Sequence, residues 1–240
     1  MHDRSDAARD RLAVHGGRVL DSPTEPQLGS IPSGDSDSEA VAETGTTTIG
    51  IAATDGVVVA TDKRASLGGR FVSNKNVQKV EQVHPTAALT LVGSVGGAQS
   101  FIRTLRSESD LYRTRRGKPM SIHALATLAG NFARGGPFFA INPILGGVDE
   151  DGSHVYSIDP AGGVMKDDYT VTGSGMMLAH GALEGQYRED ITVEEAIPLA
   201  AAAVEAAAER DTGSGNGLTV AEVTSEGVAI SDYDEYDAVQ

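Results

Sequence analysis

The stretch GTTTIGIAATDGVVVATD, residues 45–62, carries the clearest structural pattern in the chain. Its two runs of β-branched and small apolar residues, Thr48–Ala53 and Val57–Thr61, are typical of strands. Between them, Asp55-Gly56 is a dipeptide that favours a tight turn. The stretch therefore predicts a β-hairpin, and Thr46 stands just before its first strand.

Upstream of the hairpin the composition changes. Residues 1–45 contain nine acidic residues and four arginines, with Ser, Gly and Pro spread among them. The segment 30–38, SIPSGDSDS, has too few apolar side chains to build a core. We therefore expect residues 1–45 to be a largely disordered extension and residues 46–240 to be the folded domain.

Downstream, strands and helices come in groups. After the hairpin come further strands, and then apolar residues at helical spacing predict two helices between 98 and 132. A second group of strands and a second pair of helices follow, and two strands close the chain. The expected fold class is α+β, with two sheets between layers of helices. The further strands are expected at 71–73, 77–83, 87–93, 138–147, 155–158, 169–172, 218–223 and 227–231.

The last helix is expected to run from Thr192 to about Arg210. Thr192-Val-Glu-Glu195 fits a capping box, in which the two polar side chains bond free N–H groups of the first turn. Pro198 has no N–H to donate, so we expect a kink or a later start there.

Composition and charge exclude several classes of function. The net charge is −15, so the surface repels nucleic acids and anionic lipid, and the basic cluster at 113–118 is expected to be a helix end. We find neither a run of about 18 apolar residues nor a secretory signal. Without cysteine there are no disulfides, which favours a cytoplasmic protein. An acidic, lysine-poor surface also suits a high-salt cytoplasm, where screening removes self-repulsion.

Thr46 is a candidate nucleophile because of its position. A threonine run at a strand start is usually only a strand, but a cut before Thr46 would place a hydroxyl and a free amine on one residue. An α-amine has a pKa of about 7.7–8.0, so a useful fraction is neutral and can take the hydroxyl proton. A threonine activated by its own amine is a known solution to acyl transfer. This chemistry needs no metal or cofactor, and the six histidines lack metal-binding spacing.

Such a site needs a cation, a carboxylate to fix the cation, and backbone N–H groups for the oxyanion. Asp62 ends the hairpin, Lys79 follows the next turn, and Gly93 lies in a glycine-rich turn where bare backbone can approach a substrate. The alternatives are a surface ion pair worth under about 1 kcal/mol and an ordinary tight turn. Ser174 and Ser214 lie in polar turns at helix ends, where hydroxyls usually cap the helix.

Six motifs, taken in order, resemble one family, the β subunits of archaeal 20S proteasomes. The resemblance covers Thr46 to about Ile230, and YSIDPAGG at 156–163 agrees with it. It implies the N-terminal-nucleophile fold, a four-layer αββα sandwich, and a threonine endopeptidase made as a precursor. The motifs are GTTTIG at 45–50, DKR at 62–64, Lys79, GSVG at 93–96, TGSG at 172–175 and RDTGSG at 210–215.

The resemblance also implies roles for the residues around the hairpin. Thr46 would be the nucleophile. Self-cleavage between Gly45 and Thr46 would remove residues 1–45 as a propeptide and free the amine that acts as general base. Asp62 and Lys79 would tune Thr46. Gln78 is a rival for the alignment of the lysine, but an amide carries no charge.

Four further residues receive roles from the resemblance. The N–H of Gly93 would bind the oxyanion, and Ser174, Asp211 and Ser214 would hold the amine and a water. The substrate pocket would be apolar, which predicts chymotrypsin-like cleavage after large hydrophobic residues, with Glu81 at its rim. The pocket residues would be Ala65, Val77, Leu91 and Val95.

The implied partners are protein and peptide substrates, heptameric β rings stacked on heptameric α rings, and ATPases that act through the α rings. Three alternatives fit the sequence less well. One is a structural ring subunit whose site never matures. Another is an acylase of the same fold, and the third is an α-type subunit, which begins with an extra helix and lacks a Gly-Thr cut site.

Overall fold

The computed structural model describes residues 43–135 and 141–239. All of these residues belong to one compact unit of the chain, Ser36–Gln240. The expectation for residues 1–42 therefore lies outside the described residues. No helix in the described part of the chain is long and apolar enough to cross a membrane.

The predicted hairpin forms the centre of the first sheet. Within the described residues this sheet has five strands, all antiparallel, and the hairpin is longer than expected by one residue at each outer end. Valine, isoleucine and threonine fill these strands, as expected for pleated, half-buried surfaces. In spatial order the strands are β12 (Tyr169–Gly173), β2 (Thr47–Ala53), β3 (Gly56–Asp62), β13 (Leu218–Thr224) and β14 (Gly227–Tyr233).

Two helices, α3 (Met176–Glu184) and α4 (Val193–Ala208), cover one face of this sheet. Ala200 and Val204 of α4 are buried in one cluster with Ile49 and other residues of the sheet. Alanines at this interface let the helix lie close to the strands. The chain ends in a short 3₁₀ helix, η1 (Tyr236–Val239), whose Tyr236 and Val239 pack against the same cluster.

A second antiparallel sheet is covered by α1 (Val95–Arg116) and α2 (Ile122–Gly135). Phe101 and Leu105 of α1 and Leu125 of α2 are buried on it. Three arginines in the last turn of α1 confirm the helix end predicted from the basic cluster. Among the described residues the strands are β11 (Val164–Asp167), β10 (Gly152–Ile158), β9 (Ile144–Asp149), β7 (Ala87–Thr90) and β6 (Val80–His84).

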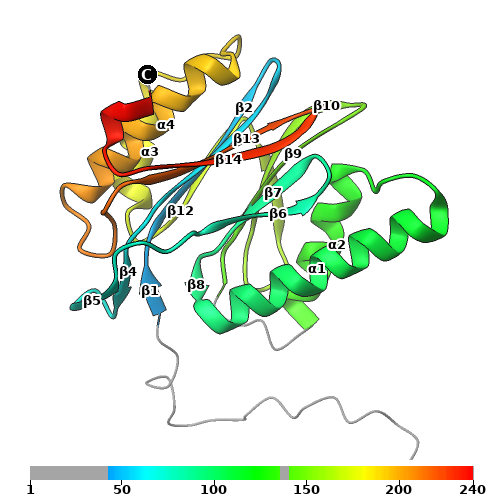
Figure 1. Cartoon of the computed structure of the whole chain (residues 1–240), viewed down its shortest axis with the longest axis horizontal. Coiled ribbons are helices and arrows are strands. Elements are labelled where there is room, and N and C mark those ends of the chain that lie inside the picture. Colours follow the sequence, from blue (N-terminus) through cyan, green and yellow to red (C-terminus); the bar gives the residue numbers. More distant parts are fainter. Residues whose placement is uncertain (1–42, 136–140, 240) are drawn as a thin grey trace, which may run out of the picture. The chain divides into compact units, whose positions relative to one another are not determined.

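The two sheets pack face to face, because valines and isoleucines from both share a third buried cluster. Val57 and Val59 of β3 meet Ile144 of β9 and Val155 of β10 there. Helices therefore lie outside two sheets, in the order α, β, β, α (Figure 1). This confirms the four-layer sandwich.

A small third sheet was not predicted. Within the described residues it runs β5 (Phe71–Asn74), β4 (Ala65–Leu67), β1 (Glu43–Gly45) and β8 (Gly93–Ser94). In β1, Thr44 lies opposite Leu67 on one side and opposite Gly93 on the other. The segment that precedes Thr46 is therefore held as a strand between β4 and β8.

Several predicted boundaries are wrong. The strand expected at 77–83 starts only at Val80, since Val77 N–H donates to Lys63 O (2.9 Å) and not to a strand of this sheet. The strand at 87–93 ends at Thr90, where the chain leaves for the third sheet. The strand expected at 138–147 is observed as β9, which begins six residues later than expected, at Ile144. The first part of the expected range, up to residue 140, lies outside the described residues.

The last helix confirms the capping box. Thr192 Oγ1 accepts from Glu195 N–H (3.3 Å), and Glu195 Oε2 accepts from Thr192 N–H (3.1 Å). The later start is wrong, since α4 begins at Val193 with Pro198 inside it. A kink at Pro198 stays a prediction.

Candidate active site

Thr46 joins β1 to β2 and is fully buried. Its hydroxyl donates to Asp62 Oδ1 (2.9 Å), and Lys79 Nζ donates to Thr46 Oγ1 (2.6 Å). Lys79 Nζ also lies 2.7 Å from Asp62 Oδ1, so the three groups form a closed triangle. The triangle unites residues that are 16, 17 and 33 positions apart in the sequence.

Asp62 is held from both of its carboxylate oxygens. Besides Thr46 and Lys79, Thr47 N–H donates to Oδ1 (3.0 Å), while Arg64 N–H (3.0 Å) and Gly215 N–H (2.9 Å) donate to Oδ2. A fully buried carboxylate with this many donors is fixed in orientation. It therefore provides a rigid anchor for the ammonium group of Lys79.

Burial is the largest influence on Lys79, and it lowers the pKa of the ammonium below 10.5. The charge and hydrogen bond of Asp62 oppose this, and so does the charge of Asp211, while Arg64 adds to the lowering. A lysine with a lowered pKa has a larger neutral fraction near neutral pH, so it can accept a proton from a hydroxyl 2.6 Å away.

A second polar group surrounds the backbone nitrogen of Thr46. The N–H of Thr46 donates to Ser174 Oγ (3.1 Å), and Ser174 Oγ in turn donates to Asp211 Oδ2 (2.6 Å). Ser214 Oγ donates to the same Asp211 oxygen (2.6 Å) and lies 2.7 Å from Thr47 Oγ1. The three residues predicted to hold the amine thus form one network, in which Ser174 contacts that nitrogen and Asp211 joins Ser174 to Ser214.

Gly45 is packed too tightly to carry a side chain. A Cβ at Gly45 would lie 2.5 Å from Gly213 Cα, 2.9 Å from Ser66 Oγ and 3.1 Å from Ser174 Oγ. Gly173, with a φ of +96°, approaches from the other side, since a Cβ there would lie 2.1 Å from Thr46 O. Close backbone approach on both sides of the Gly45–Thr46 bond therefore requires glycine.

Gly93 lies in β8 beside β1, in register with Thr44, and has a φ of +91°. It lines a cavity of about 630 Å³ together with Gly45, Ser174 and Asp211. The rest of the cavity lining includes apolar side chains and bare backbone: Val92, Ile141, Pro160, Met176, Gly68, Gly69 and Gly213.

None of the four predicted pocket residues lines this cavity, and two of them lie in or next to the strands that pair with β1. Ala65 is buried in β4, next to β1, and Val95 is the first residue of α1, directly after β8. Val77 and Leu91 are partly buried, and their N–H groups bond the carbonyls of Lys63 and Lys79.

Some residues of the site were missed by sequence reasoning. Thr47 contributes its N–H to Asp62 and its hydroxyl to Ser214, and Arg64 contributes its N–H to Asp62. The Arg64 guanidinium donates to Asn216 Oδ1 (2.9 Å) and Thr212 O (3.2 Å). These bonds connect the segment that follows β3 to the loop that precedes β13. Both Thr47 and Arg64 lie next to a predicted site residue and inside the motifs at 45–50 and 62–64, which was the available signal.

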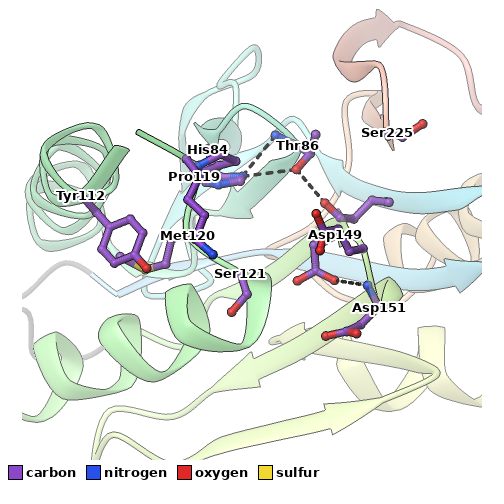
Figure 2. Close-up of a pocket in the computed structure, with 12 residues that line it drawn as sticks. His84, Thr86, Tyr112, Pro119, Met120, Ser121, Asp149, Asp151 and Ser225 are labelled. Atoms are coloured by element: carbon purple, nitrogen blue, oxygen red, sulfur yellow. Dashed lines mark hydrogen bonds between the residues drawn. The ribbon is translucent and has the colours of Figure 1, made fainter. Parts of the chain in front are cut away.

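A second cavity, of about 510 Å³, is lined by none of the predicted site residues (Figure 2). Its walls include His84, Thr86, Met120 and Asp149. Asp149 accepts from Ile122 N–H (2.7 Å) at the start of α2 and lies 2.8 Å from His154 Nε2 in β10. It therefore connects the hairpin of β9 and β10 to α2. In the described part of the chain, no cluster of His, Asp or Glu is arranged to hold a metal ion.

Comparison with known proteins agrees with this geometry. The proteasome subunit family matches residues 42–223. The chain is 73% identical to the proteasome subunit beta of Halomicrobium mukohataei, covering 91% of this chain and 93% of that protein. It is 69% identical to proteasome subunit beta 2 of Haloarcula marismortui (90% and 95% covered) and 70% identical to the proteasome subunit beta of Natronomonas pharaonis (91% and 92% covered). The chain therefore belongs to the proteasome subunit family, as an archaeal β subunit and threonine peptidase of the 20S core.

Proposed function

We propose that this β subunit activates itself by cleaving the Gly45–Thr46 bond and then hydrolyses unfolded polypeptides after large hydrophobic residues. Residues 1–45 act as the propeptide, and residues 46–240 are the mature enzyme. The single observation that carries the proposal is the position of Thr46 Oγ1, 2.6 Å from the Lys79 nitrogen and adjacent to Gly45.

In the precursor, the nitrogen of Thr46 is an amide and cannot serve as a base. Lys79, in its neutral form, takes the Thr46 hydroxyl proton while Oγ1 attacks the carbonyl carbon of Gly45. The C–N bond of Gly45–Thr46 then breaks, and the departing nitrogen takes up the proton that Lys79 removed from the hydroxyl. Ser174 already contacts that nitrogen (3.1 Å) and connects it to Asp211, so this pair supports the proton transfer.

The product of this step is an ester between the Gly45 carbonyl and Thr46 Oγ1. Water adds to the ester, releasing Gly45 as a carboxylate and restoring the hydroxyl. The new amine of Thr46 stays beside Ser174, where it acts as the general base in peptide hydrolysis. Lys79 and Asp62 keep the hydroxyl oriented, and the N–H of Gly93 stabilises the oxyanion.

The substrate takes the place of β1. Once residues 1–45 are released, the edges of β4 and β8 that pair with β1 become available to an extended peptide. Only an unfolded chain can offer its backbone in this way. Beside these edges lie the apolar residues Ala65 and Val95, which, with Val77 and Leu91, form the pocket for a large hydrophobic side chain.

The particle consists of heptameric β rings stacked on heptameric α rings, and ATPases deliver substrates through the α rings. The three similar haloarchaeal proteins are all proteasome β subunits, which supports assembly of this chain with α subunits. Segregating the site inside such a particle limits cleavage to chains that have been unfolded.

Fluorogenic peptides test this function. The chain is co-expressed with an α-type proteasome subunit, and peptides that end in Tyr, Arg or Glu before the fluorophore are compared. We expect the Tyr peptide to be cleaved fastest and the Thr46→Ala particle to cleave none of them. Faster cleavage after Arg would refute the hydrophobic preference, and activity of the Thr46→Ala particle would refute the mechanism.

A further inference from the structure

Lys63 is a buried cation that the proposed mechanism does not use. It stands between Asp62 and Arg64, and only 5% of its surface is exposed. Its Nζ lies 3.0 Å from Asp234 Oδ1, whereas the side chain of Asp234 is 94% exposed. Burying an ammonium group is unfavourable unless it is paired, so Asp234 is what allows Lys63 to stay inside.

The strand register explains how the two residues meet. Leu218 at the start of β13 lies opposite Asp62 at the end of β3 and also opposite Tyr233 at the end of β14. Lys63 and Asp234 each follow their strand by one residue. The lysine side chain therefore reaches across the start of β13 to the C-terminal segment, two strands away.

The backbone of Lys63 is joined to the groups that hold Asp62. Its N–H donates to Gly215 O (3.1 Å), and its carbonyl accepts from Val77 N–H (2.9 Å). Gly215 N–H and Arg64 N–H are the two donors to Asp62 Oδ2. A shift of Lys63 therefore moves both donors to the carboxylate that orients Thr46.

The C-terminal segment, residues 233–239, is itself docked beside this loop. Gly217 has a φ of +96°, and a Cβ there would lie 2.3 Å from Tyr233 O, so the two backbones touch. Tyr236 is half-buried, and its burial raises the pKa of its hydroxyl, with the nearby charge of Asp62 acting in the same direction. These contacts place the segment against the loop that follows Asp211.

We propose that Lys63 and Asp234 are positioning residues for Asp62, through which the C-terminal segment fixes the geometry of the reacting hydroxyl. The proposal rests on the function proposed above. It concerns the rate of the chemical step, because neither side chain lies in the cleft where a substrate would bind. Loosening the pair would shift the two donors to Asp62 Oδ2, and with them the carboxylate that orients Thr46.

The test uses particles of the full-length chain assembled with α subunits. Asp234→Asn removes the partner charge from an exposed position, and Asp234→Glu restores it. Glu235→Gln is the matched control, because it removes an exposed charge one residue further along. Lys63→Met combined with Asp234→Asn removes the pair while keeping the buried stem volume, so the double variant is expected to fold even if the lone buried ammonium is harmful.

We expect Asp234→Asn to lower kcat about tenfold with KM within about twofold, since small displacements of catalytic groups reduce rate more than binding. Self-cleavage should slow by a similar factor. The pH at which the rate of self-cleavage rises, the acid limb of its pH–rate profile, should also move to lower pH. Asp62 raises the pKa of Lys79, and loosening the contact weakens that effect. A purely structural role would leave this limb in place.

Asp234→Glu should recover most of the rate, and Glu235→Gln should match the parent. The double variant should be as slow as Asp234→Asn. A parent-like kcat for Asp234→Asn or for the double variant, or an equal loss in Glu235→Gln, would overturn the positioning role while the parent stays active. An inactive parent particle would overturn both this proposal and the proposed function.

Discussion

Replacing Asp62 by Asn tests the centre of the site, because the change keeps shape and removes charge. Both carboxylate oxygens accept N–H donors: Thr47 and Lys79 at Oδ1, Arg64 and Gly215 at Oδ2. An amide NH₂ group must therefore face two donors, whichever way it turns. At least two hydrogen bonds are lost, and the buried ammonium loses its counter-charge.

Removing one partner of a buried ion pair costs about 3–5 kcal/mol, which is the destabilisation we expect for Asp62→Asn. The loss should be largest at low pH and smaller at high pH, because Lys79 escapes the penalty by releasing its proton. Urea unfolding of the full-length chain measures this destabilisation. The parent and the Asp62→Asn chain both carry Thr46→Ala in this experiment, so that neither can remove residues 1–45.

The same substitution in a chain with Thr46 intact should slow self-cleavage at least about 100-fold, measured as the precursor fraction on a gel over time. Asp151→Asn, an exposed aspartate in the turn between β9 and β10, is the control and should change stability by less than about 0.5 kcal/mol. An Asp62→Asn chain whose free energy of unfolding lies within about 1 kcal/mol of its parent, and which matures at the parental rate, would show that Asp62 neither pairs with the buried ammonium nor positions Thr46.

Three further predictions concern the precursor and the surface. Gly45→Ala should slow self-cleavage about tenfold or more, because its Cβ would lie 2.5 Å from Gly213 Cα; a parental rate on a processing gel would contradict the packing argument. The rate of self-cleavage should rise with pH through a midpoint below 10.5, since Lys79 must be neutral to accept the proton and burial lowers its pKa; a rate independent of pH would exclude Lys79 as the base. The net charge of −15 predicts that the thermal unfolding midpoint rises between low and molar salt, and a flat response would count against screening of self-repulsion.

Short-range sequence patterns were enough to predict the helix and sheet layers of the fold. The Asp55-Gly56 hairpin and the capping box at Thr192 both follow from short-range rules, and both are present. The third sheet could not be predicted in this way. Its strands β1, β4 and β8 have two or three residues each and are defined by pairing with one another across the chain.

The same limit applies to the site. Thr46, Asp62 and Lys79 were identified by residue type, position and resemblance, and the structure brings them within 3 Å of one another. The contact between Thr47 and Ser214 spans 167 positions, and nothing in the local sequence of either residue indicates it. The pairing of Lys63 with Asp234 is likewise visible only once the register of β3, β13 and β14 is known.

The intact mass of this chain, taken from particles that are hydrolysing peptides, shows directly whether self-cleavage creates the nucleophile. We predict a polypeptide that starts at Thr46, with residues 1–45 absent. Active particles whose chains still carry Gly45 joined to Thr46 would contradict it, because the amine that serves as base in the mature enzyme would then not exist.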